Sequence, residues 1–135
     1  MSRVPNVLIM ISHDTGRFIS PYGVRTVITP SCERLAREGV LFERCFSTAP
    51  LCSPARAALF TGRYPHQNGV MGLTAEGPGK FDLYREEVHA ATLYAKHGYE
   101  SVLCGFQHES LDCRRLGFDR ILAGSGEAHN GGGRL

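Results

Sequence analysis

The sequence predicts an α/β protein with a mostly parallel sheet flanked by helices. Stretches typical of buried strands alternate along the chain with stretches typical of helices. The composition, with 42% hydrophobic and 21% charged residues over 135 positions, is that of a globular domain that can bury a core. In sheets of this kind ligands bind beyond the carboxyl ends of the strands. Polar residues that follow a strand are therefore candidates for a functional site.

The first expected element is a buried central strand at residues 6–12, where the run NVLIMIS is apolar and contains β-branched residues. A helix is expected to begin at Pro30, because Thr29 can cap it and Gly39 can end it. The apolar segment that follows, residues 40–46, has the pattern of a second strand.

A second helix is expected in LCSPARAALFTGR, with Ser53 as N-cap, Pro54 at the first helical position and Gly62 as the stop. The remaining expected elements are a helix at residues 85–97, a strand at 99–105, a short strand within 117–122, and a glycine-rich, disordered tail at 123–135.

Composition also excludes some classes of partner. The formal net charge of +2 is small and the basic residues are scattered, so we expect neither nucleic acid nor an acidic membrane as a partner. The first apolar run is too short for a signal peptide or a membrane span, which predicts a cytoplasmic protein. The five cysteines form no C-x-x-C pair, so neither a zinc knuckle nor a complete disulfide framework is expected.

Three groups of polar residues fall at predicted strand ends or helix starts: His13 with Asp14, Cys52 with Arg56, and Gln107 with His108. A helix N-terminus beside Cys52 would attract a sulfate or phosphate, and the planar guanidinium of Arg56 could hold it. Asp14 could bind a hard divalent cation that neutralises the same anion. The simpler alternative is that Cys52 is only a small buried residue before a capped helix.

The motif CSPARAALFTGR resembles the C-x-P-x-R signature, followed by T-G-R, of the type I sulfatases in the alkaline phosphatase superfamily. PNVLIMISHDTG and GFQH resemble other parts of that family, and HQNGVMGL is similar to sulfamidases and bacterial glycosaminoglycan sulfatases. The resemblance covers about residues 5–122. It implies that residues 1–122 are the N-terminal part of a sulfatase catalytic domain, an incomplete portion of an alkaline-phosphatase-like sandwich.

The resemblance implies a hydrolase of sulfuric esters or sulfamates, acting on a sulfated sugar. A formylglycine-generating enzyme would recognise Cys52, Pro54 and Arg56 and oxidise the cysteine to formylglycine. One oxygen of the hydrated aldehyde would attack sulfur, and the other would later expel sulfate. Arg56 would steady this group and His108 would help to deprotonate it.

The implied metal is Ca²⁺ or another divalent cation. Its ligands would be Asp14 and the oxygen that replaces the sulfur of Cys52, with His13 as a further candidate. Histidine stands at position 13 where the family usually has a second aspartate, and its nitrogen suits Ca²⁺ poorly.

Two further departures leave alternatives open. Phe106 stands where the family has a sulfate-binding lysine, and the chain is several times shorter than the family's enzymes, so we interpret it as an N-terminal fragment that is inactive alone. The alternatives are a non-catalytic remnant of the fold and a phosphodiesterase or phosphonate hydrolase of the same superfamily.

Overall fold

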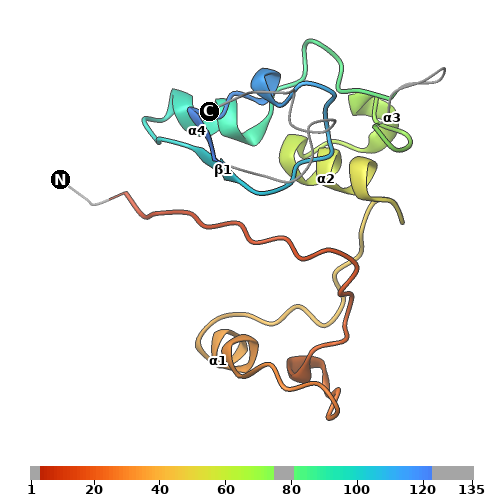
Figure 1. Cartoon of the computed structure of the whole chain (residues 1–135), viewed down its shortest axis with the longest axis vertical. Helices are drawn as coiled ribbons and strands as arrows, with labels where there is room; N and C mark the ends of the chain where they lie inside the picture. The colour runs from red at the N-terminus through yellow and green to blue at the C-terminus, as the bar shows by residue number, and fades with distance from the viewer. Residues whose placement is uncertain (1–3, 75–80, 123–135) are drawn as a thin grey trace. The chain divides into compact units, whose positions relative to one another are not determined.

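The computed structural model describes residues 4–74 and 81–122 and divides the chain into two compact units. The first unit extends to Cys45 and contains the 3₁₀ helix η1 (Ser20–Tyr22) and the helix α1 (Pro30–Glu38). The second unit begins at Phe46. Its elements, coloured from yellow to blue in Figure 1, are α2 (Cys52–Thr61), α3 (Pro65–Asn68), α4 (Ala90–Lys96), β1 (Val102–Cys104), η2 (Cys113–Leu116) and β2 (Arg120–Leu122).

In the first unit, α1 has the bounds that its sequence signals predict. Pro30 occupies the first turn, where its missing N–H costs nothing, and the helix ends before Gly39. Thr29 holds the N-cap position, but its hydroxyl does not cap the helix. It instead accepts a hydrogen bond from the Ser20 backbone N–H at 3.0 Å, which ties the start of α1 to η1.

Two predicted strands of the first unit are wrong. Residues 6–12 and 40–45 have no strand hydrogen bonding, and the large apolar side chains of the first segment are exposed, with Leu8 at 82% and Met10 at 81%. An extended segment becomes a strand only when a neighbour pairs with its backbone. Among the described residues the only pairing is between β1 and β2. Phe46, the last residue of the second predicted strand, also lies outside any strand.

The second unit contains the parallel sheet that the sequence predicts. β1 and β2 pair in parallel, with Leu103 opposite Ile121, and η2 lies in the connection between them. α2 packs against α3 and α4 (Figure 1). The core is a cluster of small and medium apolar side chains: Ala57, Val70, Leu83, Cys113 and Leu116, with Phe81, Leu103, Phe118 and Ile121 packed against it. This small α/β arrangement is the fold class expected from the sequence.

The predicted helix at 85–97 begins later than expected, at Ala90. The His89 ring accepts a hydrogen bond from the Ala91 N–H at 3.1 Å, so His89 is the N-cap and its backbone is extended. Before it, the Glu87 side chain is buried and pairs with Arg63 at 3.1 Å. These tertiary contacts override the helical pattern of the preceding residues.

No disulfide links any of the five cysteines, all of which lie in the described part of the chain. Within residues 4–74 and 81–122, no helix has the length and apolar character needed to cross a membrane. The glycine-rich tail predicted at 123–135 lies outside the described residues.

Candidate active site

Cys52 is the first residue of α2, and its side chain is half-buried. The predicted N-cap, Ser53, is instead the second helical residue, and Leu51 holds the cap position with an extended backbone. The Ser53 hydroxyl is fully buried and accepts a hydrogen bond from the Thr74 N–H at 2.9 Å. Pro54 is the third residue, still within the turn whose N–H groups have no helical acceptor. The start of the helix is therefore anchored to a distant segment, and Cys52 lies at its positive end.

Arg56, one turn further along α2, reaches the loop that follows β1. Its Nη1 donates a hydrogen bond to the Phe106 carbonyl oxygen at 3.2 Å. Its guanidinium carbon also lies over the Phe106 ring, 5.3 Å from the ring centroid. The Phe106 ring in turn contacts the His108 ring edge-on, with the centroids 5.1 Å apart. The structure thus connects Arg56 to the loop that carries His108.

The loop after β1 is held by the buried side chain of Gln107. Its Oε1 accepts hydrogen bonds from the backbone N–H groups of Glu109 at 3.1 Å and Ser110 at 3.2 Å. Its Nε2 donates to the Ser110 carbonyl at 2.9 Å. One side chain therefore fixes the turn that carries His108, which gives Gln107 a structural role.

The T-G-R part of the motif holds the end of α2 in place. The Thr61 hydroxyl donates to the Ala57 carbonyl at 2.6 Å, and the Asn68 amide donates to Thr61 and to the Arg63 carbonyl. Gly62 has a φ of 67°, in the left-handed region that favours glycine. These residues join α2 to α3, so this half of the motif supports the half that carries Cys52.

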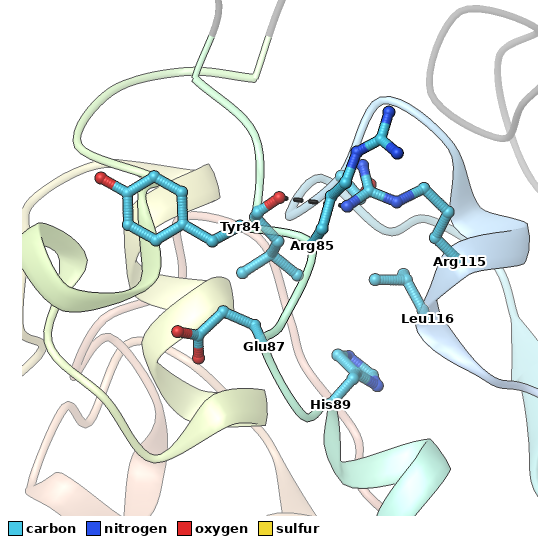
Figure 2. Close-up of a pocket in the computed structure, with 8 residues that line it drawn as sticks. Tyr84, Arg85, Glu87, His89, Arg115 and Leu116 are labelled. Atoms are coloured by element: carbon cyan, nitrogen blue, oxygen red, sulfur yellow. Dashed lines mark hydrogen bonds between the residues drawn. The ribbon is translucent and has the colours of Figure 1, made fainter.

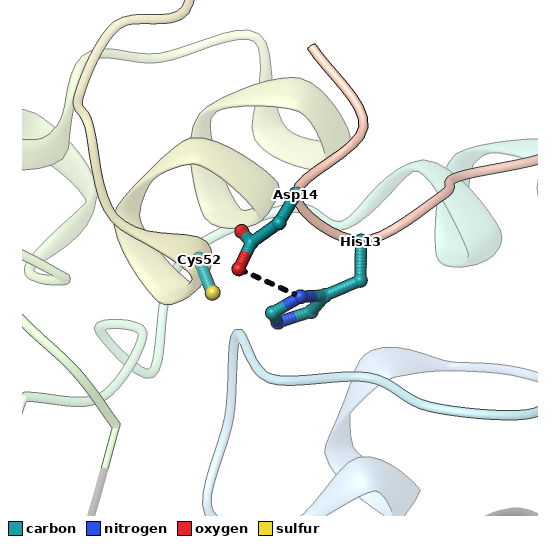
Figure 3. A group of neighbouring side chains, drawn as sticks. All are labelled: His13, Asp14 and Cys52. Carbon is teal, nitrogen blue, oxygen red and sulfur yellow. Dashed lines mark ion pairs between the residues drawn. The ribbon is translucent and has the colours of Figure 1, made fainter. Parts of the chain in front are cut away.

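His13 and Asp14 belong to the first unit, whereas Cys52, Arg56 and His108 belong to the second. The His13 Nδ1 pairs with the Asp14 Oδ2 at 3.2 Å, and both side chains are largely exposed (Figure 3). Asp14 has a φ of 51°, which is uncommon for a residue other than glycine. The carboxylate of Asp14 suits a hard divalent cation, whereas the nitrogen of His13 suits a softer one.

Sequence reasoning missed a buried pair, His89 and Glu109. Their side chains are 3% and 1% exposed, and the His89 Nε2 lies 3.5 Å from the Glu109 Oε1. The other carboxylate oxygen accepts the His108 N–H at 2.8 Å. His89 also lines a cavity of about 40 Å³ (Figure 2). Arg115 lines the same cavity and donates a hydrogen bond to the Leu83 carbonyl. A histidine immediately before the helical run AATLYAK was the available signal for the cap, but nothing local indicates its partner twenty residues later.

The chain is similar to known proteins along most of its length. The sulfatase family profile matches residues 5–130. The steryl-sulfatase of Mus musculus is 39% identical over 139 residues, covering 89% of this chain and 22% of that protein. An ulvan-active sulfatase of Formosa agariphila is 45% identical over 111 residues, covering 72% of this chain and 19% of that protein.

A solved structure is similar as well. The structure of a 2-O GAG sulfatase superposes with a TM-score of 0.61 at 28% identity, covering 77% of this chain and 22% of that one. The chain thus spans about a fifth of the length of these relatives. Because the family profile covers nearly the whole chain and the solved neighbour shares its fold, the chain belongs to the sulfatase family, whose members hydrolyse sulfate esters.

Proposed function

We propose that the protein to which this chain belongs hydrolyses sulfate esters or sulfamates, with residue 52 as a formylglycine nucleophile. One observation carries the proposal: Cys52 lies at the start of α2, and Arg56 on the next turn reaches the loop that bears His108. The N-terminal N–H groups of α2 favour an anion beside residue 52. When present, the hydrated aldehyde would supply an oxygen nucleophile in place of the thiol.

Two other residues of the chain would bind the anion and accept the proton of the nucleophile. Arg56 keeps guanidinium N–H groups beyond the one that donates to Phe106, and these would bind the oxygens of residue 52 or of sulfate. The half-buried ring of His108 would accept a proton from the nucleophile. The Gln107 hydrogen bonds would keep this ring in place during turnover.

A divalent cation, Ca²⁺ or another, would be held by Asp14 and by the oxygen of the modified residue 52, with His13 as a further ligand. When bound, it would neutralise charge on the sulfate group. The exposed carboxylate of Asp14 supports this role. A histidine next to it favours a cation softer than Ca²⁺, so the identity of the metal is best tested by comparing Ca²⁺, Mn²⁺ and Zn²⁺.

The modification can be tested directly by producing the chain together with a formylglycine-generating enzyme. Mass spectrometry of the tryptic peptide that contains Cys52 should show the aldehyde in place of the thiol. Cys104, which lies outside any C-x-P-x-R motif, is the internal control and should remain a thiol. If Cys52 stays a thiol while a known sulfatase is modified in the same cells, the proposed nucleophile is wrong.

We propose a sulfated saccharide as the substrate, on the basis of the HQNGVMGL segment and the ulvan and GAG activities named for two of the relatives. The steryl-sulfatase relative makes a sulfated lipid alcohol the competing class. A complete enzyme should therefore be assayed on heparin-derived saccharides, a steroid sulfate, a simple aryl sulfate and a phosphodiester. Turnover of the aryl or steroid sulfate alone would exclude the saccharide, and preference for the phosphodiester would favour the phosphodiesterase alternative.

The 135 residues alone should release no sulfate, even after modification of Cys52. Ca²⁺ takes about six to eight oxygen ligands, and this chain offers one strong candidate carboxylate, Asp14, besides the oxygen of residue 52. Metal-dependent sulfate release by the purified chain, abolished by Cys52→Ala, would contradict this expectation. A modified chain that remains inactive within the complete protein would favour the non-catalytic alternative.

A further inference from the structure

Phe106 is the residue that departs from the family's pattern within the loop after β1, and it lies between the two side chains to which the proposed function gives chemical roles. Its carbonyl oxygen accepts a hydrogen bond from the Arg56 Nη1 at 3.2 Å. Its ring lies beneath the Arg56 guanidinium, at 5.3 Å from carbon to centroid. The same ring meets the His108 ring at 5.1 Å and an interplanar angle of 60°. A single residue thus contacts both groups.

The two contacts of Phe106 have the geometry of specific attractions. A guanidinium within about 6 Å of an aromatic centroid interacts with the negative face of the ring. Aromatic rings with centroids about 4.5–7 Å apart favour an edge-to-face arrangement such as that of Phe106 and His108. These contacts restrict rotation of the Arg56 and His108 side chains, because each contact is lost when that side chain turns away from the Phe106 ring.

The backbone around Phe106 is shaped by both of its neighbours. Gly105 before it has a φ of 94°, a left-handed conformation that glycine adopts without strain. Gln107 after it is buried, and its Oε1 accepts hydrogen bonds from the Glu109 and Ser110 N–H groups. The hydrogen bonds of Gln107 therefore hold the loop that carries the carbonyl and ring of Phe106.

We infer that Phe106 is a positioning residue, whose carbonyl and ring orient the Arg56 guanidinium and whose ring also orients the His108 imidazole. This inference rests on the proposed function for the roles of Arg56 and His108, but the orientation itself does not depend on turnover. A lysine at this position would bring an ammonium beside the Arg56 guanidinium, and it could not offer a ring to either partner. Phe106 therefore organises neighbouring groups rather than contacting sulfate through charge.

The test compares Phe106→Leu with Phe106→Tyr by NMR of the isotope-labelled 135-residue chain. Leucine preserves apolar bulk and the backbone carbonyl, so it removes only the ring, whereas tyrosine retains the ring. We expect Phe106→Leu to increase the fast motion of the Arg56 Nε–H in ¹⁵N relaxation and to shift the His108 ring protons. Phe106→Tyr should preserve both signals. Phe46→Leu, at a position that is 85% exposed, is the matched control and should change neither.

Amide spectra of β1 and α4 show whether the variants remain folded. If Phe106→Leu fails to fold, the wild-type chain still decides the question through nuclear Overhauser contacts from the Phe106 ring to Arg56 Hδ and to the His108 ring. Absence of both contacts would overturn the inference, as would unchanged Arg56 motion and His108 shifts in a folded Phe106→Leu chain. A failure of Cys52 oxidation, by contrast, would contradict only the proposed nucleophile.

Discussion

Substitutions of the buried residues His89 and Glu109 should have non-additive effects on the free energy of unfolding. The His89 Nδ1 accepts the Ala91 N–H, so the proton of the neutral ring lies on Nε2 and faces the Glu109 carboxylate. The second oxygen of that carboxylate accepts the His108 N–H. The Glu109 Oε2 therefore accepts a hydrogen bond, whereas its Oε1 lies 3.5 Å from the buried His89 Nε2, which has no hydrogen-bond partner among the described residues. Substitution of either member changes the surroundings of a buried polar atom.

The two substitutions differ in what they preserve. His89→Asn retains a capping side chain for α4 but removes the ring beside the buried Glu109 carboxylate, which should cost about 1–3 kcal/mol. Glu109→Gln keeps an oxygen for His108 but turns an amide NH₂ toward the His89 Nε2–H. Two donors then face each other in a buried site, and the expected loss is about 1–3 kcal/mol.

A double-mutant cycle in urea, followed by circular dichroism at the helix signal, measures the coupling. We expect the loss of unfolding free energy in the double mutant to differ from the sum of the two single losses by about 1 kcal/mol or more, because both substitutions act on one contact. Leu59→Ala, on an exposed position of α2, combined with Glu109→Gln provides the additive control. Additivity within about 0.5 kcal/mol for His89 and Glu109 would refute the proposed coupling.

Two further predictions test the surroundings of the sheet. Gly117→Ala should destabilise the second unit by about 2–3 kcal/mol, because a Cβ there would collide with Thr92 Oγ1 and break the hydrogen bond from this hydroxyl to the Leu116 carbonyl. The control is Gly98→Ala, which has a similar φ but open space around it and should cost only about 1–2 kcal/mol. Equal losses of unfolding free energy in urea titrations would contradict this prediction. The backbone N–H and then the hydroxyl of Ser101 lower the pKa of Asp119, so this contribution to stability is present above the unfolded-state pKa and is lost as pH falls through the folded pKa. Ser101→Ala should raise the Asp119 pKa only part of the way to its usual value, as followed by a carboxyl ¹³C titration, and an unchanged pKa would show that the hydroxyl contributes nothing.

Local signals predicted the elements whose determinants are local. α1 begins at Pro30 and ends before Gly39, and α2 ends before Gly62, because each boundary depends on one residue's backbone preference. The strand containing Leu103 was also predicted, and its partner lies only a short connection away. The family motif was recognisable for the same reason, since its residues are close in sequence.

Elements that depend on distant partners were not predictable in this way. The apolar run at 6–12 has the composition of a central strand, but composition cannot supply the neighbouring backbone that a strand requires. The start of α4 was placed too early because the burial of Glu87 against Arg63 is a contact between segments far apart in sequence. The contact between His89 and Glu109 was not predictable for the same reason, because twenty residues separate the two side chains.

The organisation of α2 explains why the sulfatase motif is so compact. The first turn holds Cys52 and places Arg56 one turn later, where it reaches the Phe106 carbonyl. In the last turn, the Thr61 hydroxyl donates to the Ala57 carbonyl and accepts a hydrogen bond from the Asn68 amide of α3. Because one ten-residue helix carries both Cys52 and Arg56, a shift of one residue between them would rotate Arg56 by about 100° away from the loop after β1. The spacing of the motif thus follows from helical geometry, which places the Arg56 guanidinium where it meets the carbonyl and ring of Phe106.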